Sequence, residues 1–231
     1  MMNQAWIMNR GFWMGTSILC RIDRSALDRV PARGPLILAA NHVGSLEVPL
    51  LFAHLQPRQM VLLAKIETWD SRAMGWLFDR WESIPIRRGD VDLFAVHRCL
   101  EILHQGKILG LAPEGTRSRD GILRDARGGI TVIALHSGSP ILPLAHWGGE
   151  DFSGNLRHLR RTEFHIRVGK PFYLQTNDKH VNHEIRQEMV NEIMAQIAAL
   201  MPERYRGIYA GMVGRPPRYL NFLPDPVARQ D

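Results

Sequence analysis

The pair of side chains best placed for chemistry in this sequence is His42 and Glu47. His42 closely follows an apolar run, residues 36–40, that is typical of a strand buried on both faces. Ser45 favours a helix start, so Glu47 falls in the first turn and its carboxylate can reach back to the imidazole. A histidine held by a carboxylate can take a proton from a hydroxyl group. A purely structural contact would leave the same pattern.

Two basic segments follow apolar runs and can bind an anion. Arg87 and Arg88 come after the short run 84–86, and guanidinium groups at a strand end can hold a phosphate through paired hydrogen bonds. Lys65 closes another apolar run, residues 59–65, and can face the same ligand. Surface arginines and a solvated lysine would give the same pattern, so the sequence alone leaves both interpretations open.

The loop after a buried strand predicted at residues 108–112 holds a third polar group. It combines a carboxylate, a glycine that lets a ligand approach the backbone, a hydroxyl and a guanidinium, in the order Glu114, Gly115, Thr116 and Arg117. Arg127 precedes two glycines at the start of a helix predicted over residues 130–136. Such a helix entrance is a further place where an anion can bind.

These segments, taken in order, resemble the blocks of a known family. Asn41-His42 with Glu47, then residues 84–89, 113–118 and 140–143, are similar to the four ordered blocks of the glycerolipid acyltransferases. The most similar group is the bacterial 1-acyl-glycerol-3-phosphate acyltransferases, and the resemblance covers residues 30–175. The chain departs from the pattern at one position, because the family's acid is normally Asp and this chain has Glu47.

The resemblance implies a reaction and roles for these residues. A fatty acyl group would move from acyl-CoA or acyl carrier protein to the free hydroxyl of 1-acyl-glycerol-3-phosphate, giving phosphatidic acid. His42 would be the base and Glu47 would orient it, without a metal or a tightly held cofactor. The expected substrate-binding residues are Arg88, Glu114, Gly115, Thr116, Arg117, Arg127 and Lys65, with Arg88 on the acceptor phosphate.

Apolar runs alternate with amphipathic segments along the chain, which predicts an α/β fold with a mostly parallel or mixed central sheet flanked by helices. Strands are expected at residues 36–40, 59–65, 84–86, 108–112, 140–147 and 163–168. Residues 90–105 form an expected amphipathic helix whose apolar face is Leu93, Val96, Leu100 and Leu103. This arrangement places His42 where open α/β sheets bind their ligands.

The N-terminal residues 1–30 are expected to form a separate amphipathic, membrane-docking segment ahead of an acyltransferase domain over residues 31–231 with a C-terminal tail. Residues 4–20 are rich in aromatic residues and methionine, and arginines lie close by, as in helices that rest in a membrane interface. The family is similar in carrying such a segment. A terminal helix packed on the core is the alternative. We expect a peripheral protein at the cytoplasmic face of the cell membrane.

The composition narrows the class of partner. With 231 residues, 45% of them hydrophobic, and a net charge of +6, the chain can fold around a core and favours anionic partners. The arginines are spread out and no RNA-binding signature is present, which argues against a basic nucleic-acid-binding domain. A catalytically silent lipid-binding relative, in which Glu47 marks decay of the pair, is the second alternative. The expected partners are a membrane surface, a lysophospholipid acceptor and an acyl thioester.

Overall fold

The computed structural model describes residues 4–44, 46–87, 92–176 and 181–224. The helices are α1 (Gln4–Leu19), α2 (Glu47–His54), α3 (Arg72–Arg80), α4 (Leu93–His104), α5 (Gly129–Ser137), α6 (Phe152–Arg157) and α7 (His183–Ala199). The strands are β1 (Cys20–Asp23), β2 (Leu36–Ala40), β3 (Met60–Lys65), β4 (Ile84–Ile86), β5 (Ile108–Leu111), β6 (Ile141–Trp147), β7 (Thr162–Val168), β8 (Phe172–Leu174) and β9 (Leu220–Phe222). The 3-10 turns are η1 (Ser25–Arg29), η2 (Ile66–Asp70), η3 (Gly149–Asp151), η4 (Glu203–Tyr205) and η5 (Gly207–Met212).

The strands form one mixed sheet in the order β1-β7-β6-β2-β5-β3-β4, with β8 and β9 attached beside β6. Strands β6, β2, β5, β3 and β4 run parallel, whereas β7 and β8 pair antiparallel with β6. The predicted α/β fold with a mixed central sheet is confirmed. The parallel strands end at one edge of the sheet, and the loops after β2, β3 and β5 therefore meet there.

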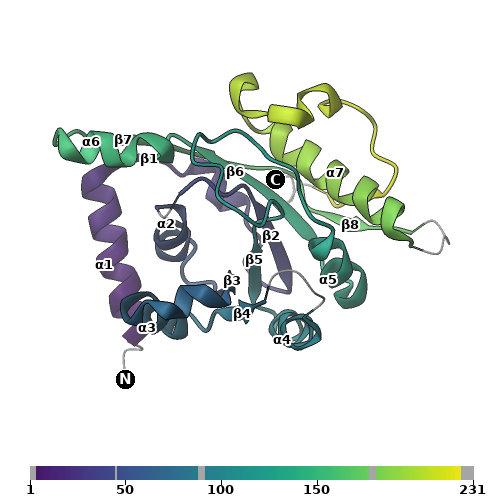
Figure 1. Cartoon of the computed structure of the whole chain (residues 1–231), viewed down its shortest axis with the longest axis horizontal. Helices are drawn as coiled ribbons and strands as arrows, with labels where there is room; N and C mark the ends of the chain where they lie inside the picture. Colours follow the sequence, from purple (N-terminus) through teal and green to yellow (C-terminus); the bar gives the residue numbers. More distant parts are fainter. Residues whose placement is uncertain (1–3, 45, 88–91, 177–180, 225–231) are drawn as a thin grey trace.

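Helices cover both faces of the sheet, as Figure 1 shows: α1, α2 and α3 lie on one side and α4, α5 and α7 on the other. Strand β2 is central because its side chains serve both layers: Ile37 packs in the core with α4, α5 and α7, and Leu38 packs in the core with α2 and α3. Both are almost completely buried, which is why the strand is apolar throughout.

Helix α1 packs on the domain with one face and exposes the other. Phe12 lies 5.6 Å from the ring of Trp81, and Asn9 accepts a 3.0 Å hydrogen bond from the indole of Trp81. On the opposite face, Met14 and Ile18 are exposed. Among the described residues, no helix combines the length and apolar content that crossing a bilayer requires.

Candidate active site

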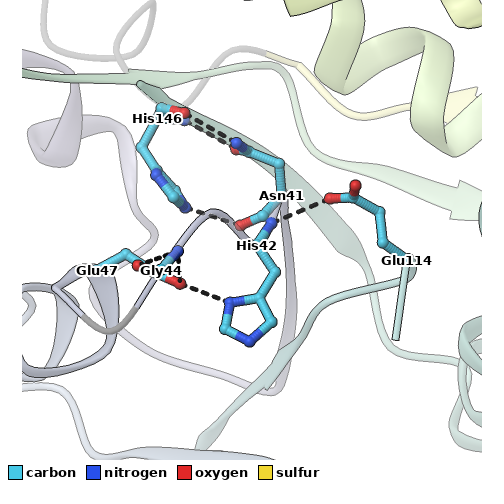
Figure 2. Close-up of polar contacts among 6 residues, drawn as sticks. All are labelled: Asn41, His42, Gly44, Glu47, Glu114 and His146. Atoms are coloured by element: carbon cyan, nitrogen blue, oxygen red, sulfur yellow. Dashed lines mark hydrogen bonds and ion pairs between the residues drawn. The ribbon is translucent and has the colours of Figure 1, made fainter. Parts of the chain in front are cut away.

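His42 and Glu47 are in direct contact, as the sequence predicts. His42 lies in the loop between β2 and α2, and its Nδ1 is 2.5 Å from Oε1 of Glu47 (Figure 2). Helix α2 begins at Glu47, two residues later than Ser45, which lies outside the described residues. The start of the helix therefore directs the carboxylate back toward the imidazole. The N–H of Gly44 lies 3.2 Å from each oxygen of the same carboxylate.

The surroundings of the pair set its protonation. Burial of Glu47 opposes ionisation, but the hydrogen bond from His42 is the main effect that favours it, and the pKa of Glu47 lies at about 2. An ionised carboxylate only accepts hydrogen bonds, so Nδ1 of His42 carries the proton. In a neutral ring, Nε2 then has a free lone pair. Figure 2 shows this nitrogen turned away from Glu47, and it has no hydrogen-bond partner among the described residues. The arrangement is that of a general base.

The peptide bond that joins Asn41 to His42 is held from both sides. Its carbonyl accepts a 2.7 Å hydrogen bond from Nε2 of His146, and its N–H donates a 3.0 Å bond to Oε1 of Glu114 (Figure 2). Both contacting side chains are buried. The backbone that carries the base is therefore fixed by two groups far away in the sequence.

His146 is a residue whose role the sequence did not indicate. It is completely buried near the end of β6, and its backbone N–H and C=O bond the side-chain amide of Asn41 at 2.9 and 2.8 Å. Burial lowers its pKa, so the ring is neutral near pH 7. Because Nε2 donates to a carbonyl, Nδ1 is the unprotonated nitrogen, and it is buried with no hydrogen-bond partner in the described part of the chain.

Glu114, which the sequence assigns to substrate binding, accepts hydrogen bonds from two backbone N–H groups of the protein. Its side chain is buried, and one oxygen accepts the N–H of His42 while the other accepts the N–H of Arg124 at 2.9 Å. Burial raises the pKa of Glu114, and the two N–H donors favour its charged form. The carboxylate joins the loop of His42 to the segment at Arg124, and we propose that Glu114 positions that loop.

A Glu114→Gln variant tests this assignment. The amide keeps one acceptor but turns an N–H₂ group toward the second backbone donor, so a hydrogen bond to a charged acceptor is lost. We expect the free energy of unfolding to fall by about 1.5–3 kcal/mol and kcat to fall with it, while KM for the acceptor is unchanged. Denaturant unfolding and steady-state kinetics measure both. A rise in KM for the acceptor with unchanged kcat would show that Glu114 contacts the substrate and does not position the loop of His42.

The loop of residues 113–118 lies directly beside the base. The N–H of Ser118 donates to the carbonyl of His42 at 2.8 Å, and the N–H of Arg119 donates to the carbonyl of Val43 at 3.2 Å. These bonds hold the loop along the segment that follows β2. Thr116 and Arg117 are exposed on this loop, and Arg117 has no salt bridge among the described residues.

Gly115 and Arg127, which the sequence also assigned to the substrate site, are neighbours. Gly115 has φ +65, and a Cβ added there would lie 3.8 Å from Cδ of Arg127. Arg127 is exposed. A glycine beneath a guanidinium leaves room for an anionic group to approach both. The structure thus brings Gly115, Thr116, Arg117 and Arg127 to the same loop region next to His42.

The other basic candidates lie farther along the same edge of the sheet. Lys65 ends β3 and is exposed. It shares the carboxyl edge with His42 because β3, β5 and β2 are parallel. Arg88, the expected phosphate contact, lies outside the described residues. Arg87, just after β4, is exposed.

The C-terminal tail supports the loop that leaves the site, a role the sequence did not indicate. The hydroxyl of Tyr209 accepts the N–H of Ala126 at 3.0 Å, and the carbonyl of Tyr205 accepts the N–H of Leu123 at 2.9 Å. These bonds fix the backbone just before Arg127. Segments with little sequence pattern of their own thus hold the loop that carries Arg127 in place.

Comparison with known proteins gives one family. The family profile described as Acyltransferase matches residues 21–147, a range that contains His42, Glu47 and the loop at 113–118.

Two curated relatives and one solved structure are similar to the chain. A lyso-ornithine lipid O-acyltransferase of Pseudomonas aeruginosa is 31% identical over 165 residues, which is 64% of this chain and 63% of that protein. A chloroplastic 1-acyl-sn-glycerol-3-phosphate acyltransferase of Brassica napus is 26% identical, over 70% of this chain and 48% of that protein. The chain thus spans about half to two thirds of these relatives. The crystal structure of a 1-acyl-sn-glycerophosphate acyltransferase from Thermotoga maritima superposes with a TM-score of 0.58 at 20% identity, covering 82% of this chain and 75% of that chain, and it has the same fold.

Proposed function

Because the chain belongs to the Acyltransferase family, we propose that it transfers a fatty acyl group from a thioester donor to the free hydroxyl of a lysolipid. The observation that carries the proposal is the pairing of His42 with the ionised Glu47, which leaves Nε2 of His42 free to accept a proton. The 2.5 Å contact favours a working pair over a catalytically silent relative.

The reaction follows from this geometry. Nε2 of His42 takes the proton of the acceptor hydroxyl while its oxygen attacks the thioester carbonyl. The tetrahedral intermediate then expels the thiolate, which takes the proton from the imidazolium. Glu47 stabilises the imidazolium in between. Acyl-CoA and acyl carrier protein both supply such a thioester, and no step requires a metal or a bound cofactor.

The acceptor carries an anionic headgroup in this proposal. Arg117 and Arg127 are exposed beside His42, and a guanidinium binds phosphate or carboxylate through two parallel bonds. 1-Acyl-glycerol-3-phosphate, which would give phosphatidic acid, is the first candidate, with Arg88 as a further phosphate contact. Lyso-ornithine lipid is the second candidate, favoured by the similarity to the Pseudomonas aeruginosa protein.

An assay of the purified chain in detergent tests the function. Each acceptor, 1-acyl-glycerol-3-phosphate and lyso-ornithine lipid, is offered with palmitoyl-CoA and with palmitoyl-acyl carrier protein, and the acylated lipid is measured by mass spectrometry. We expect acylation of at least one acceptor with at least one donor. Protein that binds the lipids but makes no product in any combination would favour the catalytically silent alternative.

Substituting Arg117 tests how the headgroup is bound. Arg117→Lys keeps the positive charge but loses the planar fork, so KM for the acceptor should rise by about tenfold, the loss of one charge-assisted hydrogen bond. KM for the thioester should stay the same. Arg29→Lys, which changes an exposed arginine of η1, is a matched control. An equal effect on an acceptor that lacks an anionic headgroup would show that Arg117 has a structural role.

The lipid substrate places the enzyme at a membrane surface, and one exposed face of α1 is suited to contact that surface. Ile7, Met14 and Ile18 project from one side of the helix and are 53%, 59% and 64% exposed. The cation Arg10 lies 4.6 Å above the ring of Trp13. We propose that this α1 face rests in the interface of an anionic membrane, on its cytoplasmic side where acyl thioesters are made.

Replacing exposed residues of α1 tests the docking without uncovering the core. Met14→Glu with Ile18→Glu changes only the outer face and leaves the packed Phe12 in place. We expect binding to vesicles of phosphatidylglycerol and phosphatidylcholine to fall by about tenfold or more, while the melting temperature is unchanged. Vesicle binding equal to wild type would show that the docking surface is not the exposed face of α1.

A further inference from the structure

Residues 156–161, which are the end of α6 and the turn before β7, expose an apolar side chain that does not pack in the core. Leu159 is 93% exposed and has φ +53. The N–H of Arg160 bonds the carbonyl of Asn155, and the N–H of Leu159 bonds that of Leu156, so the helix ends in a Schellman motif. The left-handed position of this motif normally holds glycine, since a Cβ is unfavourable there. Leu159 therefore neither favours this backbone conformation nor packs in the core.

The residues around Leu159 form a basic rim. Arg157 and Arg160 are exposed and form no salt bridge within the described ranges. The nearby Glu163 is paired with Arg21 at 3.2 Å, and Asp151 lies at the other end of α6. The segment therefore presents Leu159, with the less exposed Leu156 (43%) close by, between two guanidinium groups that form no salt bridge among the described residues. We name residues 156–161 the α6–β7 tip.

The α6–β7 tip is joined to the end of α1. The guanidinium of Arg161 donates to the carbonyls of Ser17 and Cys20 at 2.7 and 2.5 Å. Figure 1 shows α6 beside the C-terminal end of α1 at the upper left of the molecule. Ile18, the last exposed residue of the α1 face, lies in the segment that Arg161 holds. The tip thus continues a surface that is already apolar and basic.

We infer that the α6–β7 tip is a second contact with an anionic lipid bilayer, in which Leu159 inserts among the headgroups and Arg157 and Arg160 bind lipid phosphates. A projecting leucine with a second exposed leucine near it and cations on both sides suits a membrane interface. Protein interfaces instead bury packed aromatic anchors in a larger apolar core, and leucine is under-represented at their hot spots. This contact extends the docking proposed for α1 but does not depend on the acyl transfer.

The full chain with Leu159→Gly gives the sharpest test, because glycine suits the left-handed position. Its melting temperature should be equal to or above that of wild type. Sedimentation with phosphatidylglycerol–phosphatidylcholine vesicles should show an affinity about tenfold lower, the low end for burying a leucine side chain. Ile208→Ala, which trims an exposed side chain of η5, is the control and should bind as wild type.

Removing the cations separates the lipid charge from the apolar contact. Arg157→Gln and Arg160→Gln should each weaken binding to the anionic vesicles by roughly fivefold and leave binding to pure phosphatidylcholine unchanged. Turnover of a short-chain, monomeric lyso-acceptor should be the same in all tip variants, so a failure of the catalytic proposal is seen separately. Vesicle binding by Leu159→Gly equal to wild type would overturn the inference. Unchanged vesicle binding with a loss confined to the acyl carrier protein donor would assign the tip to an acidic protein instead.

Discussion

Replacing His42 with alanine should lower kcat by about 10²–10⁴-fold, the usual loss when a general base is removed. Among the described residues, the imidazole of His42 is the only side chain that forms a hydrogen bond with Glu47. Without it, no group takes the proton from the acceptor hydroxyl. KM for the thioester should change little, because the ring acts on the acceptor. Steady-state kinetics with the preferred acceptor measures the effect.

The control for His42→Ala must separate lost chemistry from lost folding. His136→Ala removes an exposed imidazole at the end of α5 and should keep full turnover. The circular dichroism and melting temperature of His42→Ala should remain close to wild type, because the hydrogen bonds that fix its backbone come from His146 and Glu114. Near-normal turnover in a folded His42→Ala protein would end the proposed mechanism.

Replacing Glu47 with glutamine should lower kcat by roughly 10²-fold or more, since the imidazolium then loses its counter-charge. The amide has nearly the same volume, but its N–H₂ group cannot accept the N–H of Gly44 while the oxygen accepts that of His42. The variant should bind the thioester and the acceptor as wild type does. Product formation measured by mass spectrometry tests this, and full activity in Glu47→Gln would show that the pair is not a working dyad.

The length of the acid gives a finer test of the same pair. Glu47→Asp shortens the side chain by one methylene and withdraws the carboxylate from both His42 and Gly44. We expect lower turnover, although Asp is the residue the resemblance implies at this position, because α2 begins at Glu47 and its backbone is set for the longer acid. Higher turnover in Glu47→Asp than in wild type would instead mark Glu47 as a decayed acid.

The fold was predictable where apolar side chains line a strand on both faces. The bounds of β2 match the run at residues 36–40, since every side chain in it is wholly or partly buried. The apolar face of α4 was predicted only in part: Leu103 is buried and Val96 and Leu100 are partly buried, but Leu93 is not. Leu93 is 67% exposed, and the buried residues are Ala95, Cys99, Ile102 and Leu103. Small side chains at two of these positions let the helix lie close to the sheet, and a count of large apolar residues misses them.

The site was predictable only for contacts close in sequence. The pairing of His42 with Glu47 spans five residues and follows from a strand followed by a helix start. The two hydrogen bonds that fix the peptide bond between Asn41 and His42 could not be predicted in this way, because His146 and Glu114 lie 105 and 72 residues from the atoms they bind. Only the sheet order, with β6 beside β2 and β5 on its other side, brings them together. No local pattern distinguishes a buried carboxylate that holds the backbone from one that contacts a ligand.

The rate of thiol release from palmitoyl-CoA, measured with and without the lysolipid acceptor, tests the central claim most directly. If His42 is a base for direct attack by the acceptor, thiol release requires the acceptor and equals the diacyl product formed, molecule for molecule. Mass spectrometry of the protein should then find no acylated form during turnover. A burst of thiol in the absence of acceptor, with an acyl group left on His42, would contradict the account and make the histidine a nucleophile.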